Sequence, residues 1–144
     1  HKSVLLWHSA HEMFALVTDI AKYPQFLPWC EKGEVLEEGD AGMVARVSMA
    51  ISGLHQSFTT RNTHESDRRV DMALVDGPFS HLEGCWQFTP LGDGTQRACK
   101  VEFSLRYGFS SQTLATLVGP VFDRIAGSLV DAFVKRADQV YGAQ

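Results

Sequence analysis

The last third of the chain limits the possible folds more than any other segment. From Leu114 to Tyr141, apolar residues recur at spacings of three and four, which predicts one long amphipathic helix. The preceding segment, Glu34–Phe109, alternates apolar and polar residues in twos between turn signals, which predicts antiparallel strands. A helix that follows such strands can bury its apolar face against the concave face of their sheet. An apolar hollow between sheet and helix is then expected.

The remaining elements follow from local signals. Residues 2–8 are predicted to form a first strand, and Ser9-Ala10-His11-Glu12 has the pattern of a capping box before a short helix. The segment Tyr23–Cys30 is expected to be a helical turn with a rigid exit, because it contains two prolines. Gly119-Pro120 predicts either a kink in the long helix or a restart with Pro120 in its first turn. Six further strands are predicted at about residues 33–38, 43–52, 55–65, 69–75, 80–91 and 96–109, with one of the turns at 92–94.

These signals predict an α+β fold with a single domain over residues 1–144. A curved antiparallel sheet of about seven strands should wrap around the C-terminal helix, with two short helices after the first strand. The net charge of −4 argues against non-specific binding to nucleic acid, so no DNA partner is expected. Three cysteines without a C-x-x-C spacing favour a reducing cytoplasm. No apolar run reaches the roughly 20 residues of a membrane-spanning helix.

Catalytic and metal-binding motifs are not evident. His11-Glu12 lacks the second histidine of a zinc-protease helix, since Ala15 stands at that position. We expect His8 and His11 to lie on the surface, and we predict no metal site. Asp71 and Glu83 on strands, and Arg61 and Asp76 beside turns, are possible acid–base residues that nothing in the sequence pairs. Their more natural place is the solvated outer face of the sheet, so no catalytic residue is assigned.

The apolar positions are therefore the candidate site. Alternation places one set of side chains on the inner face of the sheet, and helical spacing adds the facing side chains of the C-terminal helix. Methionines in this set can adapt to irregular ligands. The predicted cavity lining is Met49, Ile51, Phe58, Met72, Leu74, Leu82, Trp86, Phe103, Leu105, Phe122, Ile125 and Leu129. The predicted rim, where polar groups would orient a head group, is Tyr23, Phe26, Pro28, Trp29, Asp76, Pro78 and Phe79.

Motifs spread along the whole chain resemble those of the coenzyme-Q-binding, START-like family, which belongs with polyketide cyclase and lipid-transport proteins. They are YPQFLPWC at 23–30, FTTRN at 58–62, LVDGPF at 74–79, GCWQFTPL at 84–91 and VFDRIAGSLVDAFVKRADQVYG at 121–142. The resemblance implies a helix-grip fold. It also implies a carrier or chaperone that binds ubiquinone or a related isoprenoid lipid and supports respiration. The expected location is the cytoplasm, with transient contact to the inner membrane.

Two other functions stay open. The bacterial branch of this family is described as a toxin that binds the large ribosomal subunit and blocks subunit association. Such binding would need a local basic surface, and the candidates are Arg61, Arg68, Arg69, Arg97, Lys100, Arg106, Lys135 and Arg136. Pro120, where the pattern of that branch has arginine, removes one positive charge. A polyketide cyclase or dehydratase is expected least, because alternation places no histidine or carboxylate in the interior.

Overall fold

The computed structural model describes residues 1–51, 53–92 and 97–142, with Ile51 described by its backbone alone. The chain begins with strand β1 (Lys2–Leu6), helix α1 (Ala10–Thr18) and the 3₁₀ helix η1 (Ile20–Gln25). Six strands follow, and the chain ends in helix α2 (Gln112–Tyr141). The strands are β2 (Cys30–Gly39), β3 (Gly42–Ile51), β4 (Leu54–Glu65), β5 (Arg69–Asp76), β6 (Phe79–Pro90) and β7 (Cys99–Phe109).

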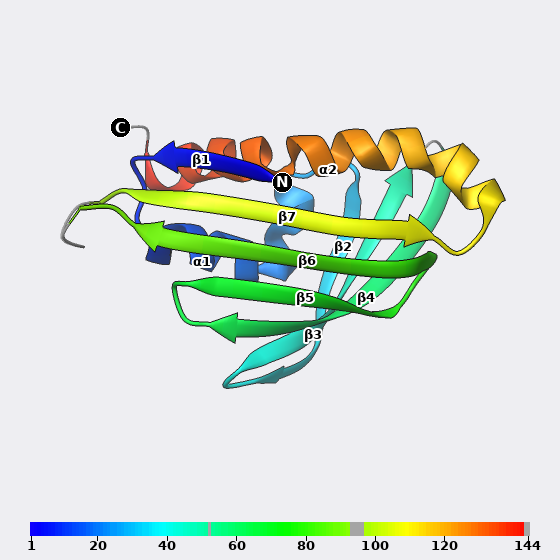
Figure 1. Cartoon of the computed structure of the whole chain (residues 1–144), viewed down its shortest axis with the longest axis horizontal. Helices are drawn as coiled ribbons and strands as arrows, with labels where there is room; N and C mark the ends of the chain where they lie inside the picture. Colours follow the sequence, from blue (N-terminus) through cyan, green and yellow to red (C-terminus); the bar gives the residue numbers. More distant parts are fainter. Residues whose placement is uncertain (52, 93–96, 143–144) are drawn as a thin grey trace.

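The seven strands form one antiparallel sheet in the order β1-β7-β6-β5-β4-β3-β2. The sheet curves strongly, so that β2, β3 and β4 cross the direction of β6 and β7, and the helices lie on the far side of the sheet in Figure 1. The predicted α+β architecture, with two short helices after the first strand and a long final helix, is confirmed. The predicted turn residues Asp93 and Gly94, and the predicted strand ends Ser52 and Gln96, lie outside the described residues.

Local sequence signals explain both helix starts. Ser9 accepts a hydrogen bond from the Glu12 backbone N–H at 3.0 Å, and the Glu12 side chain accepts one from the Ser9 backbone N–H at 2.8 Å. This reciprocal pair is the capping box that the sequence predicted. At α2, the Ser111 hydroxyl accepts from the Leu114 N–H at 3.2 Å. Both serines satisfy N–H groups that have no partner within the helix.

Helix α2 runs through Pro120 without restarting, so of the two predicted alternatives the restart is wrong. Proline removes the hydrogen bond to the carbonyl four residues earlier, here that of Thr116. Both Thr116 and Pro120 are exposed, so water can hydrate that carbonyl. Packing of the neighbouring Val118, Gly119 and Phe122, all buried, holds this part of the helix on the sheet.

Two hydrophobic clusters fill the space between sheet and helices. One joins α1, the C-terminal half of α2 and one end of β6 and β7, and includes Met13, Phe88 and Phe133. The other joins η1, β3 and the N-terminal half of α2, and includes Met49 and Phe122. No helix among the described residues is both long and apolar enough to cross a bilayer.

Candidate functional site

An apolar cavity of about 90 Å³ lies between the inner face of the sheet and α2. Its wall combines side chains of η1, β3 through β7 and α2. Ten of the twelve predicted lining residues contribute to it, namely Met49, Phe58, Met72, Leu82, Trp86, Phe103, Leu105, Phe122, Ile125 and Leu129. The wall therefore comes from segments that are far apart in the sequence, brought together by the curvature of the sheet.

Two predicted lining residues are not placed on this wall. The side chain of Ile51 lies outside the described residues. Leu74 is half-buried and packs against the hydrophobic cluster around Met49 and Phe122, without reaching the cavity. The register of β4 and β5 shifts between Thr59 and Thr60, and Thr60 pairs with Leu74 just after that irregularity. A register shift of this kind changes where a strand directs its side chains.

The structure brings two of the seven predicted rim residues to the cavity wall. Tyr23 and Trp29 line the cavity, whereas the other five residues do not. Phe79 is a core residue that stacks on Phe109 with ring centroids 5.4 Å apart. Phe26 packs edge-on against Phe133. Pro28 and Asp76 are exposed and Pro78 is half-buried, so none of the three contributes to the wall.

The cavity is small compared with cavities known to hold organic ligands. An engineered cavity of about 150 Å³ binds benzene in another protein, and this one is smaller. Met49 and Met72 are unbranched side chains on the wall, and such side chains change shape at low cost. A ligand larger than a few waters would therefore enter only as these side chains and neighbouring rings move.

The absence of a side chain at Gly84 makes room for the side chain of Met72. Gly84 on β6 lies opposite Met72 on β5. A Cβ atom at position 84 would stand 2.4 Å from the Met72 methyl carbon and 3.2 Å from Leu105 Cδ1. Both neighbours belong to the cavity wall, so the missing side chain at position 84 determines where they lie.

Two polar side chains interrupt the apolar wall. Thr60 and Asn62 on β4 line the cavity and are each 5% exposed. The Thr60 hydroxyl donates a hydrogen bond to Asn62 Oδ1 at 2.7 Å. Neither is among the predicted lining residues, although the alternation that directs Phe58 inward also directs positions 60 and 62 inward.

Groups for acid–base chemistry are scarce on this wall. Among the described lining residues there is no histidine, cysteine or carboxylate. The Tyr23 hydroxyl donates to the Val17 carbonyl, and burial raises the pKa of this phenol. Among the described residues no cluster of potential ligands could hold a metal ion.

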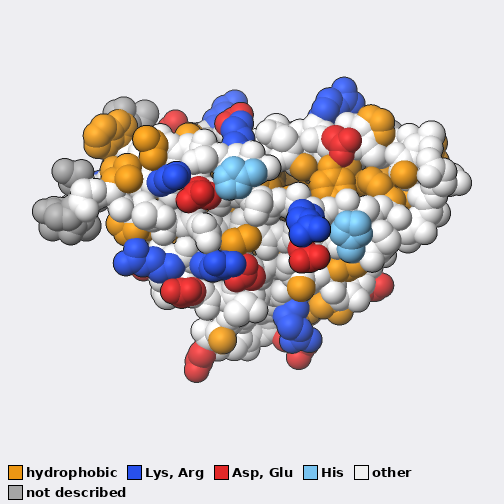
Figure 2. All heavy atoms as spheres, in the orientation of Figure 1, with side chains coloured by type: hydrophobic (Ala, Val, Ile, Leu, Met, Phe, Trp, Pro, Cys, Tyr) orange, Lys and Arg blue, Asp and Glu red, His pale blue; other side chains and the backbone are white. Residues whose placement is uncertain are grey.

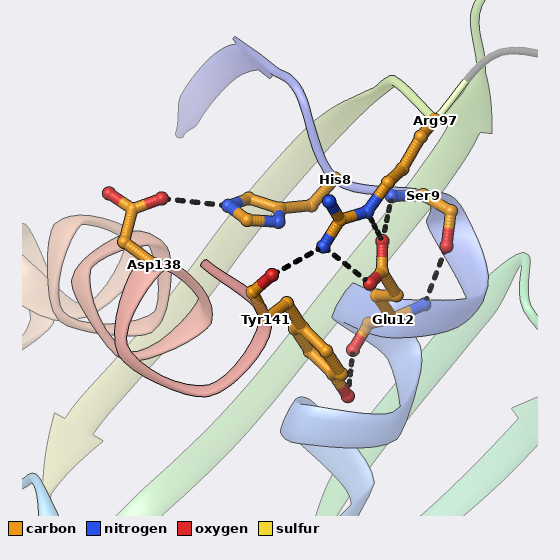
Figure 3. Close-up of polar contacts among 6 residues, drawn as sticks. All are labelled: His8, Ser9, Glu12, Arg97, Asp138 and Tyr141. Atoms are coloured by element: carbon orange, nitrogen blue, oxygen red, sulfur yellow. Dashed lines mark hydrogen bonds and ion pairs between the residues drawn. The ribbon is translucent and has the colours of Figure 1, made fainter. Parts of the chain in front are cut away.

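A polar cluster lies at the end of the molecule where α1 meets the C-terminus of α2 (Figure 3). Arg97 donates to both carboxylate oxygens of Glu12, at 2.8 and 2.9 Å, and to the Tyr141 carbonyl at 2.9 Å. Hydrogen bonds from Arg97 and then Ser9 outweigh burial, which acts in the opposite sense, and lower the pKa of Glu12 from 4.5 to about 2. None of these residues lines the cavity. The cluster instead joins α1 to the C-terminus of α2 through Arg97.

The expectation that His8 lies on the surface is wrong. His8 is 2% exposed, and its Nε2 is 2.7 Å from Asp138 Oδ1 on α2. The chain turns inward after β1, which buries the imidazole beneath the end of α2, and the carboxylate of Asp138 satisfies one ring nitrogen (Figure 3). His11, by contrast, is exposed as expected.

The basic residues do not form one uniform positive surface. Arg69 pairs with Asp71 at 2.8 Å, Lys100 lies 3.8 Å from Glu102, and Arg97 is engaged by Glu12. Arg136 contacts Gln25 and lies over the Phe26 ring. Figure 2 shows Lys and Arg side chains interspersed with Asp and Glu on the outer face of the sheet.

Comparisons with known proteins agree with this architecture. The family model described as polyketide cyclase / dehydrase and lipid transport matches residues 6–134. The ribosome association toxin RatA of Vibrio cholerae is 45% identical over 141 residues, which cover 98% of this chain and 96% of the relative. The mitochondrial coenzyme Q-binding protein COQ10 homolog B of Xenopus laevis is 28% identical, over 99% of this chain and 59% of the relative.

Solved structures show the same fold at low sequence identity. A START superfamily protein from Mycobacterium smegmatis has a TM-score of 0.75 at 20% identity, covering 96% of each chain. The Zhui aromatase/cyclase from Streptomyces sp. R1128 has a TM-score of 0.73 at 20% identity, covering 99% of this chain and 96% of its own. Because the family model spans most of the sequence and the RatA relative matches nearly end to end, this chain belongs to the polyketide cyclase / dehydrase and lipid transport family.

Proposed function

We propose that this protein binds an apolar small molecule with a polar head group, of the prenylated-quinone class that includes ubiquinone, in the cavity between the sheet and α2. The observation that carries the proposal is an interior wall that is almost wholly apolar yet contains one buried polar pair. Burial of an isoprenoid tail would supply affinity at roughly 25 cal/mol per Å², and the polar pair would orient the head.

Binding is favoured over catalysis by the chemistry of the wall. A cyclase or dehydratase needs an acid–base group within hydrogen-bond reach of its substrate. The titratable hydroxyl on the described wall, that of Tyr23, is engaged by a backbone carbonyl and its pKa is raised. The name of the Xenopus relative as a coenzyme Q-binding protein supports a quinone as the ligand.

The test has two parts. Purified protein is extracted with organic solvent and analysed by mass spectrometry for co-purified isoprenoid lipids. Emptied protein is then titrated with decylubiquinone, with quenching of tryptophan fluorescence as the readout, because Trp29 and Trp86 lie on the wall. We expect saturable binding. Titration without saturation, together with an empty extract, would refute the proposal.

A cavity-filling variant makes the test specific. Ala126 lines the cavity from α2, and Ala126→Leu adds three carbons into it without removing a contact. Binding should weaken at least tenfold in this variant, since overfilled interiors accept extra atoms poorly. Ser128→Leu is the matched control, because Ser128 is exposed on the same helix. Equal binding by both variants would place the ligand elsewhere.

A second candidate function is association with the ribosome. It is favoured by the RatA relatives at 41–45% identity, whose names describe ribosome association toxins. The overall charge of −4 opposes contact with RNA, so binding would depend on local residues such as Arg61 and Arg106. Both side chains are exposed on the outer face of the sheet.

Sedimentation of ribosomes tests this second function independently of the ligand. Addition of purified protein to separated subunits should reduce the 70S peak and leave the protein with the large subunit. Arg61→Glu combined with Arg106→Glu should abolish the effect, while Ala126→Leu should not. Unchanged subunit association at saturating protein would rule this function out.

A further inference from the structure

Two buried polar side chains on β4 lie side by side on the cavity wall. Thr60 and Asn62 are each 5% exposed, whereas Arg61 and Thr63, the neighbours of Asn62, are exposed on the outer face. Strand geometry therefore directs the hydroxyl and the amide toward the interior. Burial of polar groups in this way is unfavourable unless they find hydrogen-bond partners.

The hydrogen-bond inventory of this pair is incomplete. The Thr60 hydroxyl donates to Asn62 Oδ1 at 2.7 Å, which fixes the orientation of the amide. The amide NH₂ then retains two donors, and within residues 1–51, 53–92 and 97–142 it donates to no side chain or backbone group. Asn62 lines the cavity, so an acceptor oxygen on an occupant of the cavity is the natural partner for these donors.

The residues paired with Thr60 and Asn62 across the sheet offer no side-chain acceptor. Asn62 is flanked across the sheet by Met43 and Met72, and Thr60 is flanked by Ala45 and Leu74. An acceptor oxygen on a ligand would therefore meet one donor site within an otherwise apolar wall. In such surroundings a hydrogen bond discriminates strongly, because a ligand without the matching group leaves the protein donor unpaired.

Building on the proposed ligand-binding function, we propose that Asn62, oriented by Thr60, donates a hydrogen bond to a carbonyl oxygen of the ligand. The ligand then lies with its carbonyl-bearing head against β4 and its apolar tail against α2. This arrangement differs from the rim location that the sequence suggested for head-group recognition. Asn62 determines specificity by contact with the ligand, and Thr60 acts as a positioning residue.

The experiment compares two ligands across three variants. Decylubiquinone carries ring carbonyls, and decylbenzene carries a ring and the same tail without them; both compete with a fluorescent apolar probe for the emptied full-length protein. Asn62→Leu removes the donor while keeping the number and branching of the side-chain heavy atoms, and Thr60→Val removes the hydroxyl that orients it. Thr63→Val is the control on the outer face. Thermal unfolding of each variant identifies any loss of fold.

We expect Asn62→Leu to weaken decylubiquinone binding about tenfold, as loss of a buried neutral hydrogen bond predicts, and to leave decylbenzene unchanged. Thr60→Val should weaken decylubiquinone binding by a smaller factor in the same ligand-selective way. Thr63→Val should change neither. A merely structural role for Asn62 would weaken both ligands alike, which would overturn the inference.

The outcomes separate this inference from the function on which it rests. If wild-type protein binds decylubiquinone and Asn62→Leu binds it equally well, the carbonyl assignment is wrong while the binding function stands. If wild-type protein binds neither ligand, both proposals fail. If the variant loses decylubiquinone alone, both are supported.

Discussion

The C-terminal half of α2 covers a filled interior, whereas the middle of the helix covers the cavity. Val130 and Ala137 are at most 1% exposed, pack in the cluster with Phe88 and do not line the cavity. Ile125 and Leu129, further toward the N-terminus, are half-buried and face empty space. One helix thus covers two different interiors, one that is filled and one that contains a cavity.

Polar contacts follow the same division. The filled end is closed by the cluster of Glu12, Arg97, His8 and Asp138, which joins residues 85 to 130 positions apart. Outside that cluster, the side-chain hydrogen bonds between the sheet and α2 among the described residues are exposed, namely those of Tyr107 with Asp123 and of Lys2 with Asp131. The difference indicates that stability is concentrated away from the candidate binding site, so that the site can deform without unfolding the protein.

The largest effect should come from opening the filled interior. Phe88 is 1% exposed and packs edge-on against Phe14, with ring centroids 5.9 Å apart. Phe88→Ala should lower the free energy of unfolding by about 3–5 kcal/mol, because the surroundings cannot close the hole completely. Urea unfolding followed by circular dichroism measures this change.

The matched change at the cavity is Phe58→Ala. Phe58 is half-buried and already borders empty space, so its removal should cost only about 1–2 kcal/mol. Equal losses of unfolding free energy in Phe88→Ala and Phe58→Ala would show that the two interiors contribute equally to stability. That result would contradict the proposed difference between them.

The next effect depends on pH. Glu12→Gln removes the charge that holds Arg97 and should cost about 1–2 kcal/mol at pH 7, allowing for partial exposure of the pair. Because the pKa of Glu12 falls from 4.5 to about 2 on folding, its contribution is complete above about pH 4.5 and is lost as the pH falls toward 2. Wild-type protein and variant should therefore converge in stability at about pH 2.

Unfolding midpoints in urea across pH 2–7 measure that convergence. Glu83→Gln is the control, since Glu83 is an exposed carboxylate on the outer face of the sheet, and it should change stability little at any pH. A gap between wild-type protein and Glu12→Gln that is as large at pH 2 as at pH 7 would contradict the assigned role of the Arg97 ion pair.

The smallest effect concerns the helix over the cavity. Pro120→Ala restores a backbone N–H for the Thr116 carbonyl and should stabilise the protein by about 1 kcal/mol. Hydrogen exchange should show greater protection in residues 114–121 and unchanged protection near Ala137. Ser128→Ala, an exposed change in the other half of α2, should leave residues 114–121 unaffected. Equal protection of the backbone amides along the whole of α2 in wild-type protein would mean that the two halves of the helix do not differ in local stability.

Local sequence patterns predicted most of the fold, because alternation and helical spacing report directly which side chains are buried. The capping box of Ser9 and Glu12 and ten wall residues were predicted for that reason. The contact of His8 with Asp138 was not, because it joins positions 130 apart and no local pattern encodes it. Thr60 and Asn62 were missed because polar residues were assigned to the solvated face, although their phase in β4 matches that of Phe58.

Whether the interior is filled depends on the height at which α2 sits above the sheet, and no periodicity in the sequence reports that height. The position of the predicted rim residue Phe79 differs from the expectation for a related reason. Proline and aromatic residues indicated a rigid entrance, but Phe79 fits into the core against Phe109, and only the three-dimensional packing distinguishes these two uses of an aromatic ring.

Gly84 has a consequence for how relatives of this protein could diverge. A residue with no side chain sets the room available to Met72 and Leu105, although it is not itself part of the cavity wall. Replacement of this glycine by alanine would push both neighbours toward the space that a guest molecule would occupy. A substitution at position 84 alone would thus change the shape of the cavity, and with it the preferred ligand, while every residue on the cavity wall stays the same.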